Sequence, residues 1–184
     1  MAGGHLTETP IDSVYSSVVS LRAIRLLTFL AELNDMEVWC TDIGNAYLES
    51  HTKEKVYIIA GPEFGNRAGH VLIINKALYG LKLSGLRWSE QCADCLRAMG
   101  YFPCKAENDV WMKDCQDHYE CIAVCVDDLL IASKNPQDIV DQLTKTHKFN
   151  LRAQGRFPSI LAAITSVIRM ESYVTHNAST SRSV

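Results

Sequence analysis

Residues 125–133 read CVDDLLIAS, two adjacent acids inside an otherwise apolar stretch. Apolar residues on both sides favour strands and Asp is common in turns, so the segment predicts strand, turn and strand. Neighbouring buried carboxylates repel, and one takes up a proton unless a cation lies between them. Mg²⁺ prefers such oxygen ligands. Asp127 and Asp128 are therefore candidate metal ligands; the alternative is that they are simply the two residues of a hairpin turn.

Asp42 is a second acid at the end of a predicted strand, EVWCTD at residues 37–42, and Tyr47 follows five residues later. In a two-metal phosphoryl-transfer site, carboxylates on neighbouring strand ends hold two ions about 3.5–4 Å apart. Asp42 and Asp127 fit such a pair. The alternative for Asp42 is a solvated strand end.

The remaining pattern predicts helices alternating with strands. Three- and four-residue apolar steps predict a helix over residues 12–33, begun by Asp12 or Ser13. Ser84 and Gly100 would start and stop a helix over 84–99, and Pro136 would begin the last helix, over 136–147. A short helix is expected at 46–49, and strands at 37–42, 55–60, 71–78, 110–113, 119–126 and 129–133. The strands at 110–113 and 119–126 are expected to lie around a turn at Gln116 and Asp117. This order predicts an α+β domain with an antiparallel sheet packed on helices.

Composition narrows the class of protein. A chain of 184 residues that is 47% hydrophobic fits one globular domain, while a net charge of -3 counts against a free-standing nucleic-acid binder. It has neither an apolar run of about 18 residues nor a leader pattern, so no membrane span is expected and the protein should be intracellular. The seven cysteines are then expected to be reduced. Cys92 and Cys95 form a C-x-x-C pair for which packing is the expected role.

Four ordered stretches resemble the reverse transcriptase domain of copia-type LTR retrotransposons. They are TDIGNAYLES (41–50), NKALYGLKLSGLRW (75–88), KAENDVWM (105–112) and CVDDLLIAS (125–133). Residues 9–34 resemble the segment that leads into this family's first catalytic aspartate, and the resemblance covers about residues 4–150. It implies an RNA-directed DNA polymerase on a right-hand palm, here with partial fingers and no thumb. The implied partners are an RNA or DNA template-primer and deoxynucleoside triphosphates.

The resemblance also assigns roles to particular residues. Asp42 matches the first catalytic aspartate, and Asp127 and Asp128 match the pair in the family's Tyr-Val-Asp-Asp signature. Together they would bind two Mg²⁺ ions, with Mn²⁺ as an alternative, and the backbone carbonyl of Ile43 would assist. Tyr47 matches the aromatic residue under the incoming sugar; the alternative is a core aromatic.

Two cations and one cysteine complete the implied site. Lys82 and Arg87 are candidate phosphate contacts, although either could be a solvated charge at a helix end, and the neighbouring Trp88 is expected in the core. Cys125 stands near the primer terminus, where the family has Tyr. Leu83 stands where the family often has Gln or another polar residue.

Other departures from the family predict an inactive, truncated copy. The chain begins after the basic fingers segment, and the thumb, RNase H and integrase parts of the Pol polyprotein are expected to be missing. The parent element would work in cytoplasmic virus-like particles or the nucleus. The alternative to an enzyme is a non-catalytic relic or interaction module that keeps a palm-like fold. An unrelated metal-dependent phosphohydrolase is a third class.

The last part of the chain departs from the family most. After Asn150 the family continues with a Gly-x-Gly motif, which residues 151–184 lack. Back-translating residues 152–173 and reading from the third codon base permits GTGPISFHLGCDYFRDSDGILC, which restores that continuation. We therefore predict a frameshift near Leu151, with residues 151–184 as an out-of-frame or disordered tail. The genomic DNA of the locus would test this.

Overall fold

The computed structural model describes residues 18–156; residues 1–17 and 157–184 lie outside this description. The described chain forms two compact units. The hairpin unit is Asn45–Asp94, and the sheet unit comprises residues 18–44 and 95–156. The fold is mixed α+β with an antiparallel sheet packed on helices, as the sequence predicts.

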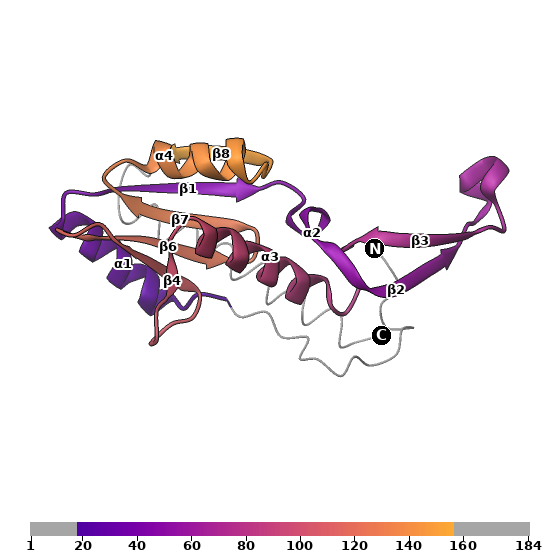
Figure 1. The fold of residues 1–184 in the computed structure, drawn as a ribbon, viewed down its shortest axis with the longest axis horizontal. Helices are drawn as coiled ribbons and strands as arrows, with labels where there is room; N and C mark the ends of the chain where they lie inside the picture. The colour runs from indigo at the N-terminus through magenta and orange to yellow at the C-terminus, as the bar shows by residue number, and fades with distance from the viewer. Residues whose placement is uncertain (1–17, 157–184) are drawn as a thin grey trace. The chain divides into compact units, whose positions relative to one another are not determined.

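The sheet unit is built on six antiparallel strands in the order β4-β5-β6-β7-β1-β8 (Figure 1). Their bounds are β1 (Glu37–Ile43), β4 (Phe102–Pro103), β5 (Val110–Asp114), β6 (Tyr119–Cys125), β7 (Asp128–Ser133) and β8 (Leu151–Arg156). The strands predicted at 37–42, 110–113, 119–126 and 129–133 are confirmed within a residue or two. The sequence pattern missed β4 and β8.

Helix α1 (Leu21–Leu33) covers one face of this sheet. Its apolar stripe packs with the core residues Val110, Cys121, Ala123, Cys125, Leu130 and Ala132. The helix starts later than predicted, because Ser20 caps it by accepting a hydrogen bond from the Ala23 N–H at 3.3 Å. The helix predicted over 12–33 is therefore wrong at residues 18–20, which precede α1. The predicted start at Asp12 or Ser13 lies outside the described residues. Val19 is buried in the core instead of lying on a helical turn.

The last predicted helix is present as α4 (Pro136–Asp141), which continues as one π turn, η3 (Gln142–Thr146). Pro136 occupies the first turn, where its missing N–H costs nothing. The segment contacts β1 and β7, and Ile139, Val140 and Leu143 are buried.

The hairpin unit contains α2 (Ala46–Glu49) and the antiparallel pair β2 (His51–Ile59) and β3 (Val71–Lys76), joined through the 3₁₀ segment η2 (Pro62–Arg67). These elements confirm the short helix and the two strands that the sequence predicts. Apolar side chains on both strands are exposed, including Tyr57, Ile59, Val71 and Ile73.

Helix α3 (Ser84–Ala98) runs from the hairpin unit into the sheet unit. The predicted stop is confirmed: Gly100 has φ 88°, and the Tyr101 N–H donates to the Leu96 carbonyl at 2.9 Å. The predicted cap is wrong, because the Ser84 hydroxyl donates to the Leu78 carbonyl at 2.7 Å and the residue is itself the first of the helix. No helix within residues 18–156 is long and apolar enough to cross a membrane.

Candidate functional site

Asp42, Asp127 and Asp128 come together at one end of the six-stranded sheet. Asp42 near the end of β1 lies directly opposite Asp128, the first residue of β7. Cys125 also pairs with Asp128, so a two-residue turn, Val126 and Asp127, joins β6 to β7. The idea that Asp127 and Asp128 form the turn is thus wrong by one residue, because Asp128 already belongs to the ladder.

The backbone fixes this arrangement. The Ile43 N–H donates to the Asp127 carbonyl at 2.8 Å, and the Gly44 N–H donates to the Asn150 carbonyl at 2.7 Å. Between Asp42 and Ile43 the pairing of β1 with β8 shifts register. Such irregularities change the direction of a side chain next to them and are common beside active sites.

The turn itself is strained. Val126 has φ 56°, in the left-handed region that a β-branched residue rarely enters. Strain of this kind costs about 1–3 kcal/mol and persists where surrounding structure imposes it, often at functional sites. Here it lies between the buried Cys125 and the first of the two adjacent acids.

Burial and neighbouring charges raise the pKa values of Asp127 and Asp128. Burial, followed by the charges of Asp127 and Asp42, raises the pKa of Asp128 to about 7. Burial also raises the pKa of Asp127, with Asp42 adding to the effect and Arg152 opposing it. The site thus holds more negative charge than its surroundings neutralise, a condition that a bound cation would relieve.

The thiol of Cys40 is affected by burial and by two of the same carboxylates. Cys40, two residues before Asp42, has its pKa raised to about 12 by burial and then by Asp128 and Asp42. Among residues 18–156, one group of three side chains has metal-binding atoms that all lie within 4.8 Å of one another, and this group does not include the aspartates. Their donors are all carboxylate oxygens, which Mg²⁺ prefers, and this ion keeps several waters and uses few protein ligands.

The residues expected to bind the substrate lie in the hairpin unit. Tyr47 contacts the ring of Tyr79, with centroids 4.4 Å apart. Arg87 is 7% exposed and forms ion pairs with Glu54 and Glu90, and the hydrogen bond that it donates to Glu54 is the main cause that raises its pKa. Lys82 is half-buried. Trp88 is buried, as expected for a core residue.

Cys125 lies in the core of the sheet unit. Its side chain is 5% exposed and belongs to the cluster that α1 covers. Cys125 thus takes part in the packing of the sheet unit, and its place near a primer terminus stays a prediction.

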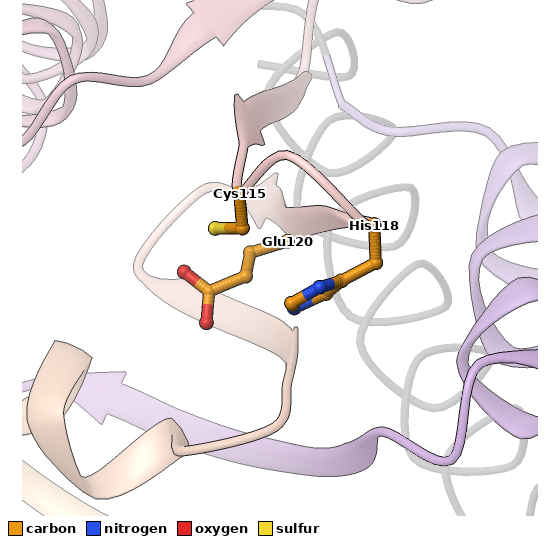
Figure 2. Close-up of side chains that lie close together, drawn as sticks. All are labelled: Cys115, His118 and Glu120. Carbon is orange, nitrogen blue, oxygen red and sulfur yellow. The ribbon is translucent and has the colours of Figure 1, made fainter.

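Sequence reasoning missed a second cluster, Cys115, His118 and Glu120, at the turn between β5 and β6 (Figure 2). The signal was present as C-x-x-H-x-E across the predicted turn at Gln116 and Asp117. Strand alternation around a two-residue loop brings these three positions to one face.

The residues after Asn150 begin as an ordered strand. Leu151–Arg156 form β8, which pairs with β1. The predicted tail from residue 157 onward lies outside the described chain. The frameshift near Leu151 stays a prediction for the DNA.

Comparison with known proteins identifies the family. Residues 4–173 match the family model described as "Reverse transcriptase (RNA-dependent DNA polymerase)". The retrovirus-related Pol polyprotein from transposon TNT 1-94 of Nicotiana tabacum is 28% identical over 127 residues, which are 67% of this chain and 10% of that protein. A Saccharomyces cerevisiae protein named for transposon Ty5-1 is 31% identical over 124 residues, 65% of this chain and 40% of that protein.

The retrovirus-related Pol polyprotein from transposon RE1 of Arabidopsis thaliana is 26% identical over 124 residues, 66% of this chain and 8% of that protein. The chain therefore spans less than half the length of these relatives. No solved structure matches it significantly. The family match covers most of the sequence, and the chain belongs to the reverse transcriptase family of copia-type retrotransposons.

Proposed function

We propose that Asp42, Asp127 and Asp128 form the two-metal site of an RNA-directed DNA polymerase, carried on the palm of a right-hand fold. The observation that carries this proposal is the pairing of Asp42 with Asp128 beside a strained turn that presents Asp127. The raised pKa values of Asp127 and Asp128 support it, because an excess of buried negative charge is typical of a cation site.

The three acids have two kinds of task in this proposal. Asp42 and Asp127 hold both ions, the carbonyl of Ile43 assists, and Asp128 supports the primer-side ion. When bound, Mg²⁺ or Mn²⁺ supplies activation of the primer 3′-hydroxyl and charge stabilisation of the leaving pyrophosphate. The hydrogen bond from Ile43 to the Asp127 carbonyl keeps the turn at the end of β1 and so positions the Asp127 carboxylate.

The substrates in this proposal are template-primer and deoxynucleoside triphosphates. Tyr47 would lie under the incoming sugar and exclude a 2′-hydroxyl by contact, and Lys82 is the better candidate for a phosphate contact. Arg87 already binds Glu54 and Glu90, so most of its hydrogen-bonding capacity is used within the hairpin unit. The other domains of a Pol polyprotein would be its partners.

The 184-residue chain alone should extend primers poorly or not at all. Its net charge of -3 gives little attraction for a phosphate backbone, the thiol of Cys125 is buried, and Arg87 is occupied by two glutamates. The last two observations also favour the second candidate function, a non-catalytic relic or interaction module that retains a palm-like fold.

Ion binding tests the site without requiring activity. Electron paramagnetic resonance of free Mn²⁺ should show that the purified chain binds Mn²⁺ and that Asp127→Asn weakens binding at least about tenfold, as the loss of a ligand oxygen predicts. Asp141→Asn is the matched control, because Asp141 lies on α4 and pairs with Lys145. Equal affinity in the wild type and Asp127→Asn would refute the proposed site.

Primer extension then separates enzyme from relic. We expect no Asp127-dependent product from the wild type or from Cys125→Tyr, because a larger side chain enters a packed core at position 125. Substantial extension by either protein, abolished by Asp127→Asn, would overturn the expectation of inactivity.

A further inference from the structure

The hairpin of β5 and β6 gathers three different metal-binding groups on one face. Cys115 and His118 flank the two-residue loop, and the Cys115 N–H donates to the His118 carbonyl at 2.9 Å. Glu120 follows two residues after His118 and so points to the same side of β6. One donor atom from each residue lies within 4.8 Å of the other two, and Figure 2 shows the three side chains converging below the turn.

The histidine is oriented for an additional partner. Its Nδ1 lies 2.6 Å from Oδ1 of Asp117, and its side chain is only 9% exposed. Lys134 Nζ lies 2.9 Å from Oδ2 of the same carboxylate, so Asp117 accepts hydrogen bonds from both side chains. In this arrangement Nδ1 of His118 donates to Asp117, and Nε2 presents a lone pair. Nε2 is buried and has no hydrogen-bond partner among residues 18–156.

The unpartnered Nε2 and the carboxylate held at Nδ1 are together typical of a metal-binding histidine. A buried polar atom without a partner is uncommon, and a histidine held through one nitrogen by a carboxylate is the usual arrangement of a metal-binding imidazole. The orientation by Asp117 leaves Nε2 as the donor available to an ion.

Glu120 is held in place as well. The Tyr101 hydroxyl donates to its Oε2 at 3.2 Å, and the Ser133 hydroxyl donates to its Oε1. An ionised carboxylate has about four acceptor positions, so these two bonds orient the group and leave capacity for a cation. The carboxylate thereby connects the β5–β6 turn with the end of β7 and with the residue that follows Gly100.

We propose that Cys115 Sγ, His118 Nε2 and the Glu120 carboxylate form a Zn²⁺ site, with the fourth position taken by water. One thiolate, one imidazole and one carboxylate are the ligand types that Zn²⁺ accepts and Mg²⁺ does not combine. All three residues are of intermediate burial, and because Nε2 of His118 is itself buried, the side chains must shift slightly to admit the ion.

This site is separate from the aspartates. Glu120 and Ser133 lie at one end of β6 and β7, whereas Cys125 and Asp128 pair at the other end. The five residue steps along β6 from Glu120 to Cys125 correspond to about 17 Å. An ion here cannot take part in nucleotidyl transfer, and its role is to brace the β5–β6 turn, whose Glu120 is also bonded to Tyr101 and Ser133.

The two nearby lysine side chains interact with groups other than the three proposed ligands. Lys134 binds Asp117 at 2.9 Å, and Lys113 lies over the ring of Tyr101 with its nitrogen 5.5 Å from the centroid. Zinc bonds are about 2.0–2.3 Å long, so the three donors must draw together by about 1 Å on binding. Partial burial and Glu120 raise the pKa of the Cys115 thiol, so the ion displaces a proton there.

Zinc titration of the purified chain under reducing conditions, with excess Mg²⁺ to fill the aspartates, tests the proposal. We expect one Zn²⁺ per chain, read by competition with a chromophoric chelator. Cys115→Ser and His118→Gln should each weaken binding at least about 100-fold, since ligand loss exceeds the 10–100-fold effect of outer partners. Asp117→Asn, at an exposed position, should weaken it about tenfold without disturbing the fold.

Matched variants exclude non-specific thiol binding. Cys104→Ser alters another half-buried thiol of the sheet unit, and Asp127→Asn alters the other site; both should bind zinc like the wild type. In the Co²⁺-loaded chain, the thiolate charge-transfer absorption should be lost in Cys115→Ser and kept in Cys104→Ser. Absence of stoichiometric zinc binding, or equal affinity in Asp117→Asn, His118→Gln and the wild type, would overturn the site whatever the outcome for the aspartates.

Discussion

Two groups of carboxylates in this chain differ in whether neighbouring cations neutralise their charge. Around Arg87 the acids Glu54 and Glu90 are matched by the cations Arg87 and Lys53, and the bond from Lys53 is the main cause that lowers the pKa of Glu90. In the sheet unit, burial and neighbouring acids raise the pKa of Asp128 to about 7.

The difference separates structural acids from candidate functional ones. A carboxylate with a lowered pKa contributes to the stability of the fold at neutral pH, because its charge already has a partner. A carboxylate with a raised pKa costs stability at neutral pH, and such a group is retained where an ion or substrate uses its charge. Two substitutions and the addition of Mg²⁺ test this contrast, and a third substitution tests the turn beside Asp128, in order of expected effect.

Removing the central cation should have the largest effect. Arg87→Met should lower the free energy of unfolding by about 2–3 kcal/mol, because a buried guanidinium that binds two glutamates is lost. Lys53→Met is the control: Lys53 is 66% exposed, and its pair with Glu90 should be worth less than about 1 kcal/mol. Urea denaturation measures both. Equal losses would show that the network does not depend on Arg87.

Neutralising an unmatched acid should stabilise the chain. The folded pKa of Asp128, about 7, lies above the unfolded value of about 3.9. The folded state therefore binds this proton more tightly between those pH values and loses stability as pH rises through that window.

Asp128→Asn in EDTA should accordingly be more stable than the wild type at pH 8 by about 1–2 kcal/mol, after allowance for solvent screening of a partly exposed group. The gain should vanish near pH 4. Asp141→Asn should show no such gain, because its carboxylate is already paired with Lys145. Chemical denaturation at pH 5 and pH 8 measures the difference, and a pH-independent gap would contradict an origin in the charge of Asp128.

Adding Mg²⁺ should also stabilise the wild type. Mg²⁺ at ten times its dissociation constant adds about 1.4 kcal/mol if it binds the folded chain alone. The shift in thermal midpoint should be reduced in Asp127→Asn and retained in Arg87→Met. An equal shift in Asp127→Asn and the wild type would place the ion elsewhere.

The smallest effect concerns the turn between the two strands. Val126→Gly should stabilise the chain by about 1 kcal/mol or less, because relief of left-handed strain exceeds the entropy cost of glycine. Val124→Gly, at a paired position of β6, should instead destabilise it. Thermal unfolding compares the two, and a loss of stability in both would show that Val126 is not strained.

Local features were predictable and distant pairings were not. Apolar runs identified β1, β5, β6 and β7, and Gly100 marked the end of α3, because both signals lie within a few residues. The opposition of Asp42 and Asp128 depends on pairing strands 86 positions apart, which no periodicity encodes. The same holds for Glu54, whose contact with Arg87 joins residues 33 positions apart.

Two misses have particular causes. Several polar residues precede α1, and burial of Val19 selects Ser20 as the cap, which is a tertiary effect. Cys115, His118 and Glu120 were within reach of the sequence, since the predicted turn at Gln116 and Asp117 places them on one face. They were missed because adjacent acids and C-x-x-C pairs are contiguous signals, whereas this cluster emerges only when strand alternation is extended across a turn.

The position of β1 between β7 and β8 has a consequence for how this gene can change. Every side chain of an interior strand changes face when one residue is inserted or deleted, so a length change there would turn Asp42 away from Asp128. Point substitutions leave the ladder in place. Point mutations can therefore replace the aspartates of the candidate site while its backbone geometry is kept. A single codon gained or lost in β1 would instead disrupt the position of Asp42 and the strand register together.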